Sequence, residues 1–285
     1  MKLVSFALGR DHGVGIATPA GVVDLRTRLH VRSLRELLAK DLVAQASRLE
    51  AEPADFALNA VTLLPVVPDP AHFYCVGVNY AEHLNEVSDP AAPPYKAQYP
   101  SMFIRFPESM TGAGSALCIP KVSEQLDFEA ELALVIGKGG RYIDRATALS
   151  HVAGYTCCNE GSVRDWQIHT SQVAPGKNFF QSGALGPWLV TADEIGDPGH
   201  LAISCRVNGA LMQSSNTSRM IFDVASIVSY ASSMVALQAG DVISTGTPQG
   251  VGYARKPPVF LKPGDVCEVE IEGIGVLRNP VVREG

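Results

Sequence analysis

The chain contains the stretch Leu126-Asp127-Phe128-Glu129-Ala130-Glu131-Leu132-Ala133-Leu134-Val135-Ile136, whose pattern decides the fold around it. In an extended strand, successive side chains point to opposite faces, so the apolar residues from Phe128 to Ile136 at even-numbered positions share one face. Glu129 and Glu131 then point to the other face, roughly 6.6 Å apart along the strand. This spacing allows both carboxylates to reach one cation.

A third acidic residue, Glu160, follows in the stretch CCNEGSVRDWQ, residues 157–167. Carboxylate oxygens are hard donors, and two or three of them without Cys or His ligands suit Mg²⁺ or Mn²⁺ better than Zn²⁺. The three glutamates are therefore the candidate ligands of a divalent metal.

The alternative interpretation of such glutamates is a solvated strand face. The same chain offers an example near its C-terminus, where Glu268, Glu270 and Glu272 alternate with apolar residues and are interpreted as exposed. The face of the candidate ligands differs, because it continues through Ala133 and Val135 and is expected to be covered further along. This difference favours the metal site.

The composition of the 285 residues is that of an ordinary globular protein, with 46% hydrophobic and 18% charged residues. A formal net charge of −6 argues against a nucleic-acid partner. No apolar run approaches the ~18 residues that span a bilayer, and the N-terminus lacks a signal-peptide core, so we expect a cytoplasmic enzyme and no membrane partner. The six cysteines show no CxxC spacing and are expected to be buried thiols.

Residues 1–66 are predicted to form a small α/β module, and residues 70–285 a larger catalytic domain. The module begins with short strands over residues 3–7, 13–18 and 21–24 and continues with helical periodicity over residues 33–50. A Pro-rich stretch, residues 65–70, serves as the linker.

The larger domain is predicted to be α+β and mostly β, because many short strand-like runs are separated by Gly and Pro turns and helical patterns are few. Neither GxxxxGK[ST] nor a strand followed by GxGxxG is present, so kinase and dehydrogenase chemistry lack a basis. The expected strands cover residues 73–76, 102–104, 131–136, 188–191, 202–207, 242–245 and 266–271, and the expected helices residues 79–86, 145–150, 162–170 and 222–233.

His83 and Glu86 are three residues apart in a predicted helix and so share one face. A carboxylate in this position orients the imidazole and raises its basicity, which is the arrangement of a general base. The alternative is a surface ion pair. Residues 88–95, which follow, are polar and Pro-rich and are expected to form a loop that closes over a site.

Two further segments carry candidate groups. Lys177 stands between a glycine and two aromatic residues, and it is either a site cation or a solvated lysine. The loop around Thr247, residues 245–252, is rich in glycine. Its backbone N–H groups can receive a carboxylate, although a plain tight turn is an equal alternative.

Taken in order, five stretches resemble the fumarylacetoacetate hydrolase family over about residues 70–283. The resemblance implies a mixed β-roll catalytic domain, a metal held by three carboxylates and a homodimer. The five stretches are VGVNYAEHLNE (76–86), PSMFIRFP (100–107), DFEAELALVIGK (127–138), GYTCCNEGSVRDWQ (154–167) and STGTPQGVG (244–252).

The resemblance also implies roles for single residues. The chain departs from the family pattern at Glu160, because Asp is more usual there, and the longer side chain bears on the coordination geometry. The implied roles are metal ligation by Glu129, Glu131 and Glu160, water activation by His83 with Glu86, charge stabilisation by Lys177, and substrate contact by Arg164, Gln167 and the Thr247 loop.

The function expected first is metal-dependent hydrolysis of a C–C bond in an acylpyruvate, such as the maleylpyruvate or fumarylpyruvate of aromatic compound degradation. His83 deprotonates a water that attacks the distal carbonyl, and Lys177 stabilises the oxyanion. A pyruvate enolate, neutralised by Mg²⁺ or Mn²⁺, then leaves. Arg105 is expected to pair with a second carboxylate of the 2-oxo acid substrate.

Other functions remain open at this point. The resemblance also admits decarboxylation of oxaloacetate and isomerisation of 2-hydroxyhepta-2,4-diene-1,7-dioate, which pass through a similar enolate. A metal-binding or ligand-binding protein without turnover is a further alternative, against which the paired His83 and Glu86 argue. The substrate and the preferred metal are not determined by the residues.

Overall fold

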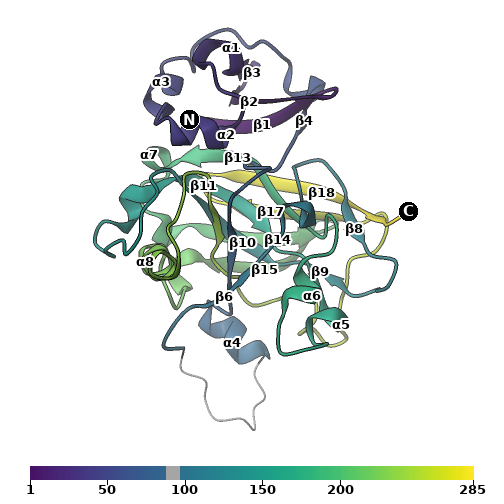
Figure 1. Cartoon of the computed structure of the whole chain (residues 1–285). Helices are drawn as coiled ribbons and strands as arrows, with labels where there is room; N and C mark the ends of the chain where they lie inside the picture. Colours follow the sequence, from purple (N-terminus) through teal and green to yellow (C-terminus); the bar gives the residue numbers. More distant parts are fainter. Residues whose placement is uncertain (88–96) are drawn as a thin grey trace.

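The structure is a computed structural model that describes residues 1–87 and 97–285 (Figure 1). The loop expected to close over the site, residues 88–95, lies outside the described residues. Two packed β-sheets form the body of the molecule, and the N-terminal residues lie at one end of it (Figure 1). The prediction of a mostly β, α+β fold is confirmed.

The larger sheet runs through both parts of the chain. The first strand of the N-terminal part pairs with a strand of the main part, with Leu3 opposite Leu189, so the N-terminal strands extend the main sheet. The sheet order is β3 (Gly21–Asp24), β2 (Asp11–Thr18), β1 (Lys2–Leu8), β13 (Gly183–Thr191), β11 (Val152–Asn159), β10 (Ala130–Ile136), β16 (Val242–Ser244), β5 (Phe73–Gly77) and β6 (Ser101–Ile104), while β4 (Thr62–Leu63) pairs with β1 and β7 (Met110–Thr111) with β13.

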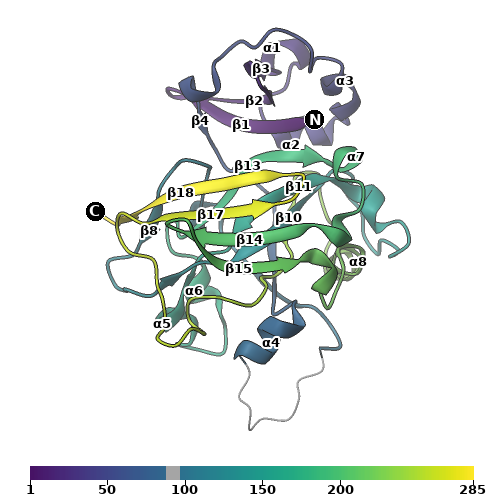
Figure 2. The same ribbon diagram turned by 180° about the vertical axis from the view of Figure 1, so that it is seen from behind.

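The smaller sheet lies behind the larger one and is seen in Figure 2. One hydrophobic cluster contains buried residues of both sheets, such as Leu134 and Val269, and joins them into one core. The order of the smaller sheet is β15 (Ala210–Asn216), β14 (Ala202–Val207), β17 (Val266–Ile271), β18 (Gly275–Arg283) and β8 (Leu117–Ile119).

Strand β10 is buried on both faces. Its even-numbered residues, with Phe128 ahead of them, belong to the core between the sheets, as the alternation predicts. On the other face Ala133 and Val135 pack in a second cluster with Leu34 and Leu37 of the N-terminal part. The predicted cover further along the face of Glu129 and Glu131 is therefore supplied partly by the N-terminal residues and partly by the main part of the chain.

The helical periodicity of residues 33–50 gives two short helices instead of one, α2 (Leu34–Ala39) and α3 (Val43–Ser47). The break lies at Asp41, whose φ of 54° is left-handed and cannot continue a right-handed helix. α1 (Arg26–Leu29) precedes them. The division of the chain at residues 66–70 stays a prediction.

The remaining helices are short. The helix predicted over residues 145–150 is wrong, because a 3₁₀ turn over Ala148–His151 stands there. The Asp144 carboxylate accepts a hydrogen bond from the backbone N–H of Ala146 at 2.8 Å, a local bond that competes with a helical start. The others are α4 (Ala81–Val87), α5 (Arg164–Gln167), α6 (Ala174–Lys177), α7 (Ala192–Ile195), α8 (Val224–Met234) and the 3₁₀ turns Leu58–Ala60, Pro107–Ser109, Pro198–His200 and Thr217–Arg219.

All six cysteines are buried and unpaired, as expected. None of the helices in residues 1–87 and 97–285 is long and apolar enough to cross a membrane.

Candidate metal centre

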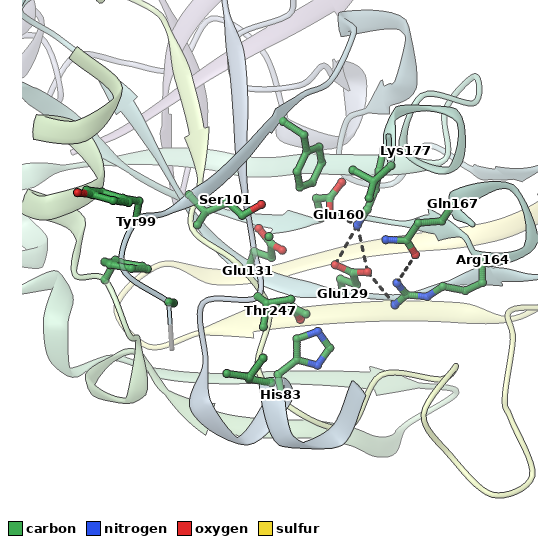
Figure 3. Close-up of a pocket in the computed structure, with 18 residues that line it drawn as sticks. His83, Tyr99, Ser101, Glu129, Glu131, Glu160, Arg164, Gln167, Lys177 and Thr247 are labelled. Carbon is green, nitrogen blue, oxygen red and sulfur yellow. Dashed lines mark hydrogen bonds and ion pairs between the residues drawn. The ribbon is translucent and has the colours of Figure 1, made fainter. Parts of the chain in front are cut away.

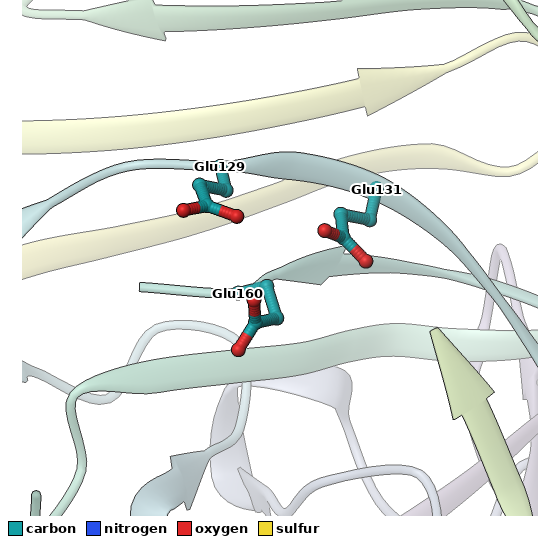
Figure 4. Close-up of side chains that lie close together, drawn as sticks. All are labelled: Glu129, Glu131 and Glu160. Atoms are coloured by element: carbon teal, nitrogen blue, oxygen red, sulfur yellow. The ribbon is translucent and has the colours of Figure 1, made fainter. Parts of the chain in front are cut away.

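The three candidate ligands meet at one end of the β10–β11 pair (Figure 4). Glu129 precedes β10 and Glu131 lies on it, while Glu160 directly follows β11. The antiparallel register and a hydrogen bond of 2.9 Å from the N–H of Glu160 to the carbonyl of Glu129 bring the third carboxylate beside the first two. One oxygen from each lies within 4.8 Å of the others, and all three residues are at most 5% exposed.

Glu131 is held by neutral donors. One of its oxygens, Oε2, accepts hydrogen bonds from the Ser244 hydroxyl at 2.5 Å and from the Gly246 backbone N–H at 2.9 Å. Burial, together with repulsion from the Glu160 and Glu129 carboxylates, raises the pKa of Glu131 well above its usual range. Among the described residues no cationic side chain bonds to Glu131, and the nearby Lys177 offsets only part of the burial and repulsion.

Glu129 is held by charged donors. Its Oε1 accepts a hydrogen bond from the Ser162 hydroxyl at 2.7 Å and pairs with Nη2 of Arg164 at 2.7 Å. Burial alone would raise the pKa of Glu129, but the Lys177 ammonium, Arg164 and His83 outweigh burial and lower it. Glu129 is therefore an anion in the folded protein.

Glu160 is held by Arg105, whose Nη1 donates to Oε1 at 2.7 Å. The guanidinium is completely buried and also donates to the hydroxyls of Ser109 at 3.0 Å and Ser182 at 2.8 Å. Arg105 thus lies behind Glu160 and does not line the cavity in front of the glutamates. This geometry does not support the expectation that Arg105 binds a substrate carboxylate.

Lys177, at the end of α6, reaches the open side of the centre. Its Nζ lies 3.1 and 3.2 Å from the two carboxylate oxygens of Glu129 and forms a close ion pair with Oε2 of Glu160. Burial lowers the pKa of Lys177, but these two carboxylates overcome burial and raise it. The ammonium shows that this position attracts a cation.

The donor set fits Mg²⁺ or Mn²⁺. Fixed donors other than Lys177 hold one oxygen of each glutamate, which leaves Oε2 of Glu129, Oε1 of Glu131 and Oε2 of Glu160 for an ion. Three hard oxygens on rigid strands suit a six-coordinate cation that keeps further positions for water or substrate. A bound cation would also compensate the charge of Glu131.

His83 and Glu86 lie together on α4, with Nδ1 of the imidazole 3.2 Å from Oε2 of the carboxylate. Glu86 is in turn fixed by the backbone N–H of Gly250, which lies 3.0 Å from both carboxylate oxygens. Because Nδ1 is engaged with Glu86, the other ring nitrogen, Nε2, is available to a bound molecule. His83 is 6% exposed and lies across the cavity from the glutamates (Figure 3).

Arg164 and Gln167 lie on α5, and their side chains are joined by a hydrogen bond of 2.9 Å from Nη1 to Oε1. Nε of Arg164 donates to the buried Asp127 at 2.8 Å. Asp127 also accepts backbone hydrogen bonds of 2.8 Å from Gly252 and Tyr253, so it ties α5 to the glycine loop. Sequence analysis missed this role, although Asp127 opens the same motif as the first two glutamates.

The glycine loop binds the protein's own carboxylates. The N–H groups of Gly246 and Gly250 donate to Glu131 and Glu86, respectively. Gly246 has a φ of +99°, and a Cβ there would lie 2.7 Å from a side-chain carbon of Asn79, so only glycine fits. Thr247 lines the cavity, but its hydroxyl already donates to a carbonyl of β10 at 3.0 Å.

These groups surround one cavity of about 400 Å³ (Figure 3). Of the ten predicted site residues, the cavity wall includes His83, Lys177, Arg164, Gln167, Thr247 and the three glutamates, while Glu86 and Arg105 stand behind it. Sequence analysis assigned no role to the remaining lining residues. Some of them, such as Ser101 and Phe103, lie within the quoted motifs, whereas Tyr99, Val173 and Phe222 lie outside them.

Comparison with known proteins identifies the family of the chain. The fumarylacetoacetate (FAA) hydrolase C-terminal family matches residues 72–282. The mitochondrial oxaloacetate tautomerase fahd2 of Xenopus laevis is 42% identical over 293 residues, which cover 99% of this chain and 90% of that protein.

Solved structures are similar over the whole chain. The fumarylacetoacetate hydrolase of Exiguobacterium antarcticum has a TM-score of 0.82 at 34% identity, with full coverage of both chains. Maleylpyruvate hydrolase of Sphingobium sp. SYK-6, solved with manganese(II) and pyruvate, also has a TM-score of 0.82 at 26% identity and full coverage of both. The chain is a member of the fumarylacetoacetate hydrolase family.

Proposed function

We propose that this chain is a divalent-metal-dependent enzyme that interconverts the keto and enol tautomers of a small 2-oxo acid, with oxaloacetate as the substrate. The observation that carries the proposal is the position of His83, which faces three convergent carboxylates across one cavity. The tautomerase relative supports the substrate, because it matches 99% of the chain. Sequence analysis considered oxaloacetate only as a substrate for decarboxylation.

The charges around the cavity favour an anionic substrate once a metal is bound. Four buried carboxylates face three buried cations, which leaves a formal excess of one negative charge. A divalent cation reverses the sign of this buried set, so the metal would give a carboxylate group of the substrate a positive partner. The charged residues are Asp127, Glu129, Glu131 and Glu160 against Arg105, Arg164 and Lys177.

Tautomerisation moves one proton between carbon and oxygen. Nε2 of His83 takes the proton from the carbon next to the keto group, and the electron pair of that C–H bond becomes the C=C bond. The protonated imidazole then gives the same proton to the keto oxygen, which completes the enol. The reverse reaction uses the same groups. Glu86 keeps the imidazole oriented through Nδ1. The divalent cation, held by Glu129, Glu131 and Glu160, would supply a Lewis acid for the 2-oxo acid group.

The test follows the loss of enol absorbance when oxaloacetate, supplied as the enol, is added to the enzyme. We expect faster decay with enzyme and Mg²⁺ or Mn²⁺ than with the metal alone, and no matching release of pyruvate. A decay rate equal to that of the metal alone would contradict the proposal. Pyruvate released in step with oxaloacetate consumption would indicate decarboxylation instead.

Hydrolysis of an acylpyruvate is the second candidate, and the His83–Glu86 pair favours it, since the same imidazole can deprotonate a water. The structural similarity to maleylpyruvate hydrolase supports it at lower sequence identity. A panel of maleylpyruvate, fumarylpyruvate and 2-hydroxyhepta-2,4-diene-1,7-dioate with product detection separates hydrolysis and isomerisation from tautomerisation. Metal binding without any turnover would leave a binding protein.

Two further expectations stay predictions. The homodimer that the family resemblance implies is tested by analytical ultracentrifugation of the full chain. The expected cytoplasmic location is tested by subcellular fractionation. The test is needed because the tautomerase of Xenopus laevis is named as a mitochondrial protein.

A further inference from the structure

The three glutamates share an asymmetry that goes beyond their ability to bind a metal. In each carboxylate, fixed donors hold one oxygen: Oε1 of Glu129, Oε2 of Glu131 and Oε1 of Glu160. Among the described residues, the other oxygen of each receives no hydrogen bond except from Lys177. Each glutamate can therefore offer one oxygen to an ion without losing its bond to a fixed donor, and at Glu129 and Glu160 the ion would take the place of the Lys177 ammonium.

We propose that these outer donors select Mg²⁺ or Mn²⁺ against Ca²⁺ and that Arg105 is the principal specificity-determining residue. Ca²⁺ takes six to eight oxygens and often uses carboxylates through both oxygens, whereas Mg²⁺ requires six in near-octahedral positions. Three single-oxygen ligands with three further positions complete an octahedron. The larger coordination shell of Ca²⁺ would need the second oxygen of one or more glutamates, and these oxygens already accept hydrogen bonds from the protein. The inference rests on the metal site of the proposed function.

Arg105 is the outer donor that, among the described residues, holds its glutamate oxygen alone. Oε1 of Glu129 is held by both Ser162 and Arg164, and Oε2 of Glu131 is held by both Ser244 and the backbone N–H of Gly246. The Arg105 guanidinium cannot turn away from Glu160, because its other N–H groups are bonded to Ser109, Ser182 and the carbonyl of Gly161 in a fully buried position.

Arg105 therefore acts on the ion only through Glu160 and is a positioning residue. The length of the Glu160 side chain has a role in this arrangement. Its carboxylate bridges Arg105 on one side and the open centre on the other. An aspartate is shorter by one methylene and would extend less far toward these two groups from the same backbone position.

The test compares the affinities of the metal-free protein for Ca²⁺ and Mn²⁺ by titration calorimetry. Arg105→Met frees Oε1 of Glu160, and we expect the ratio of Ca²⁺ to Mn²⁺ affinity to rise on the order of tenfold, the usual scale for loss of an outer-shell partner. Because both ions carry the same charge, the general effect of removing a positive charge cancels in the ratio. Arg105→Lys retains a donor for Oε1 and should keep the ratio near that of the parent.

Ser244→Ala and Ser162→Ala keep the proposal testable if Arg105→Met does not fold. Each removes one donor from a different glutamate, and a smaller rise in the same ratio is expected. An unchanged ratio of Ca²⁺ to Mn²⁺ affinity in the folded variants would overturn this inference but not the proposed function. Equal affinity of the parent protein for Ca²⁺ and Mn²⁺ would do the same. A parent protein that binds neither ion would overturn the proposed metal-dependent function as well.

Discussion

Replacing Glu131 by Gln should stabilise the metal-free protein while removing its response to metal. Glu131 is 1% exposed, and no cationic side chain in the described part of the chain bonds to it. The amide keeps the shape of the side chain, and its oxygen can still accept from Gly246. The substitution removes a buried carboxyl that two neighbouring carboxylates repel.

The direction of the effect follows from the raised pKa of Glu131. In the unfolded chain a glutamate titrates near pH 4.3, whereas burial and repulsion raise the pKa of Glu131 in the folded protein. A raised carboxyl pKa costs stability above the unfolded value and costs nothing below it. We expect the variant to gain about 2 kcal/mol at neutral pH, within the roughly 1–4 kcal/mol that replacement of buried ionic groups by neutral ones can gain. This corresponds to a rise in Tm of about 4 °C.

The assay is thermal unfolding in excess chelator and in excess Mn²⁺, at neutral and acidic pH. In chelator at neutral pH the variant should melt above the parent, and the difference should shrink as the pH falls toward about 4. In excess Mn²⁺ the parent should melt above the variant. A ligand at 100 times its Kd adds about 2.7 kcal/mol to the free energy of unfolding, and only the parent is expected to bind the ion.

Glu270→Gln is the matched control, because it makes the same chemical change at an exposed position on β17 and should leave the melting curves unchanged. A Glu131→Gln variant that melts below the parent in chelator at neutral pH would refute the electrostatic reasoning. Equal stabilisation of parent and variant by Mn²⁺ would refute the assignment of Glu131 as a ligand.

Three further predictions concern activity and ligation. Excess EDTA should abolish turnover and Mg²⁺ or Mn²⁺ should restore it, as measured by enol decay, so full activity in EDTA would exclude metal dependence. His83→Asn should lower turnover by roughly 10²–10⁴-fold while Mn²⁺ affinity stays near that of the parent, and Glu86→Gln should cost less because the imidazole remains; turnover at the parent rate in His83→Asn would rule out the base. Glu160→Asp should keep partial Mn²⁺ binding by calorimetry, since Asp is the more usual family residue, whereas Glu160→Ala should lose it; unchanged binding in both would mean that Glu160 is not a ligand.

Much of the fold was predictable because alternation is a local property. The alternating pattern around residues 130–136 predicted both the strand β10 and the face to which Glu129 and Glu131 point. Side chains on a strand alternate between its two faces whatever surrounds them. The strands at residues 202–207 and 266–271 were predicted with their observed bounds, β14 and β17, for the same reason. Glu270 and Glu272 are exposed as expected, whereas Glu268 is only partly exposed because it pairs with Arg278.

Predictions failed where a single residue or a local bond overrides the pattern. The periodicity of residues 33–50 does not reveal that Asp41 adopts a left-handed conformation, because φ at one residue depends on how the chain must turn back to the sheet. The pattern of apolar and polar residues over 145–150 allows a helix. The Asp144 side chain, however, accepts a hydrogen bond from the backbone N–H of Ala146 near the expected start of that helix.

The sequence by itself determined the carboxylate pair, the His83–Glu86 spacing and, through five motifs, the family. Only the tertiary structure decided how these parts meet. Pairing of β10 with β11 carries Glu160 to the first two glutamates, and burial directs Arg105 inward to Glu160 and away from a substrate. The physical reason is that spacing along one strand or helix follows from backbone geometry, whereas contacts between distant segments depend on strand register and on which polar groups must find partners once buried.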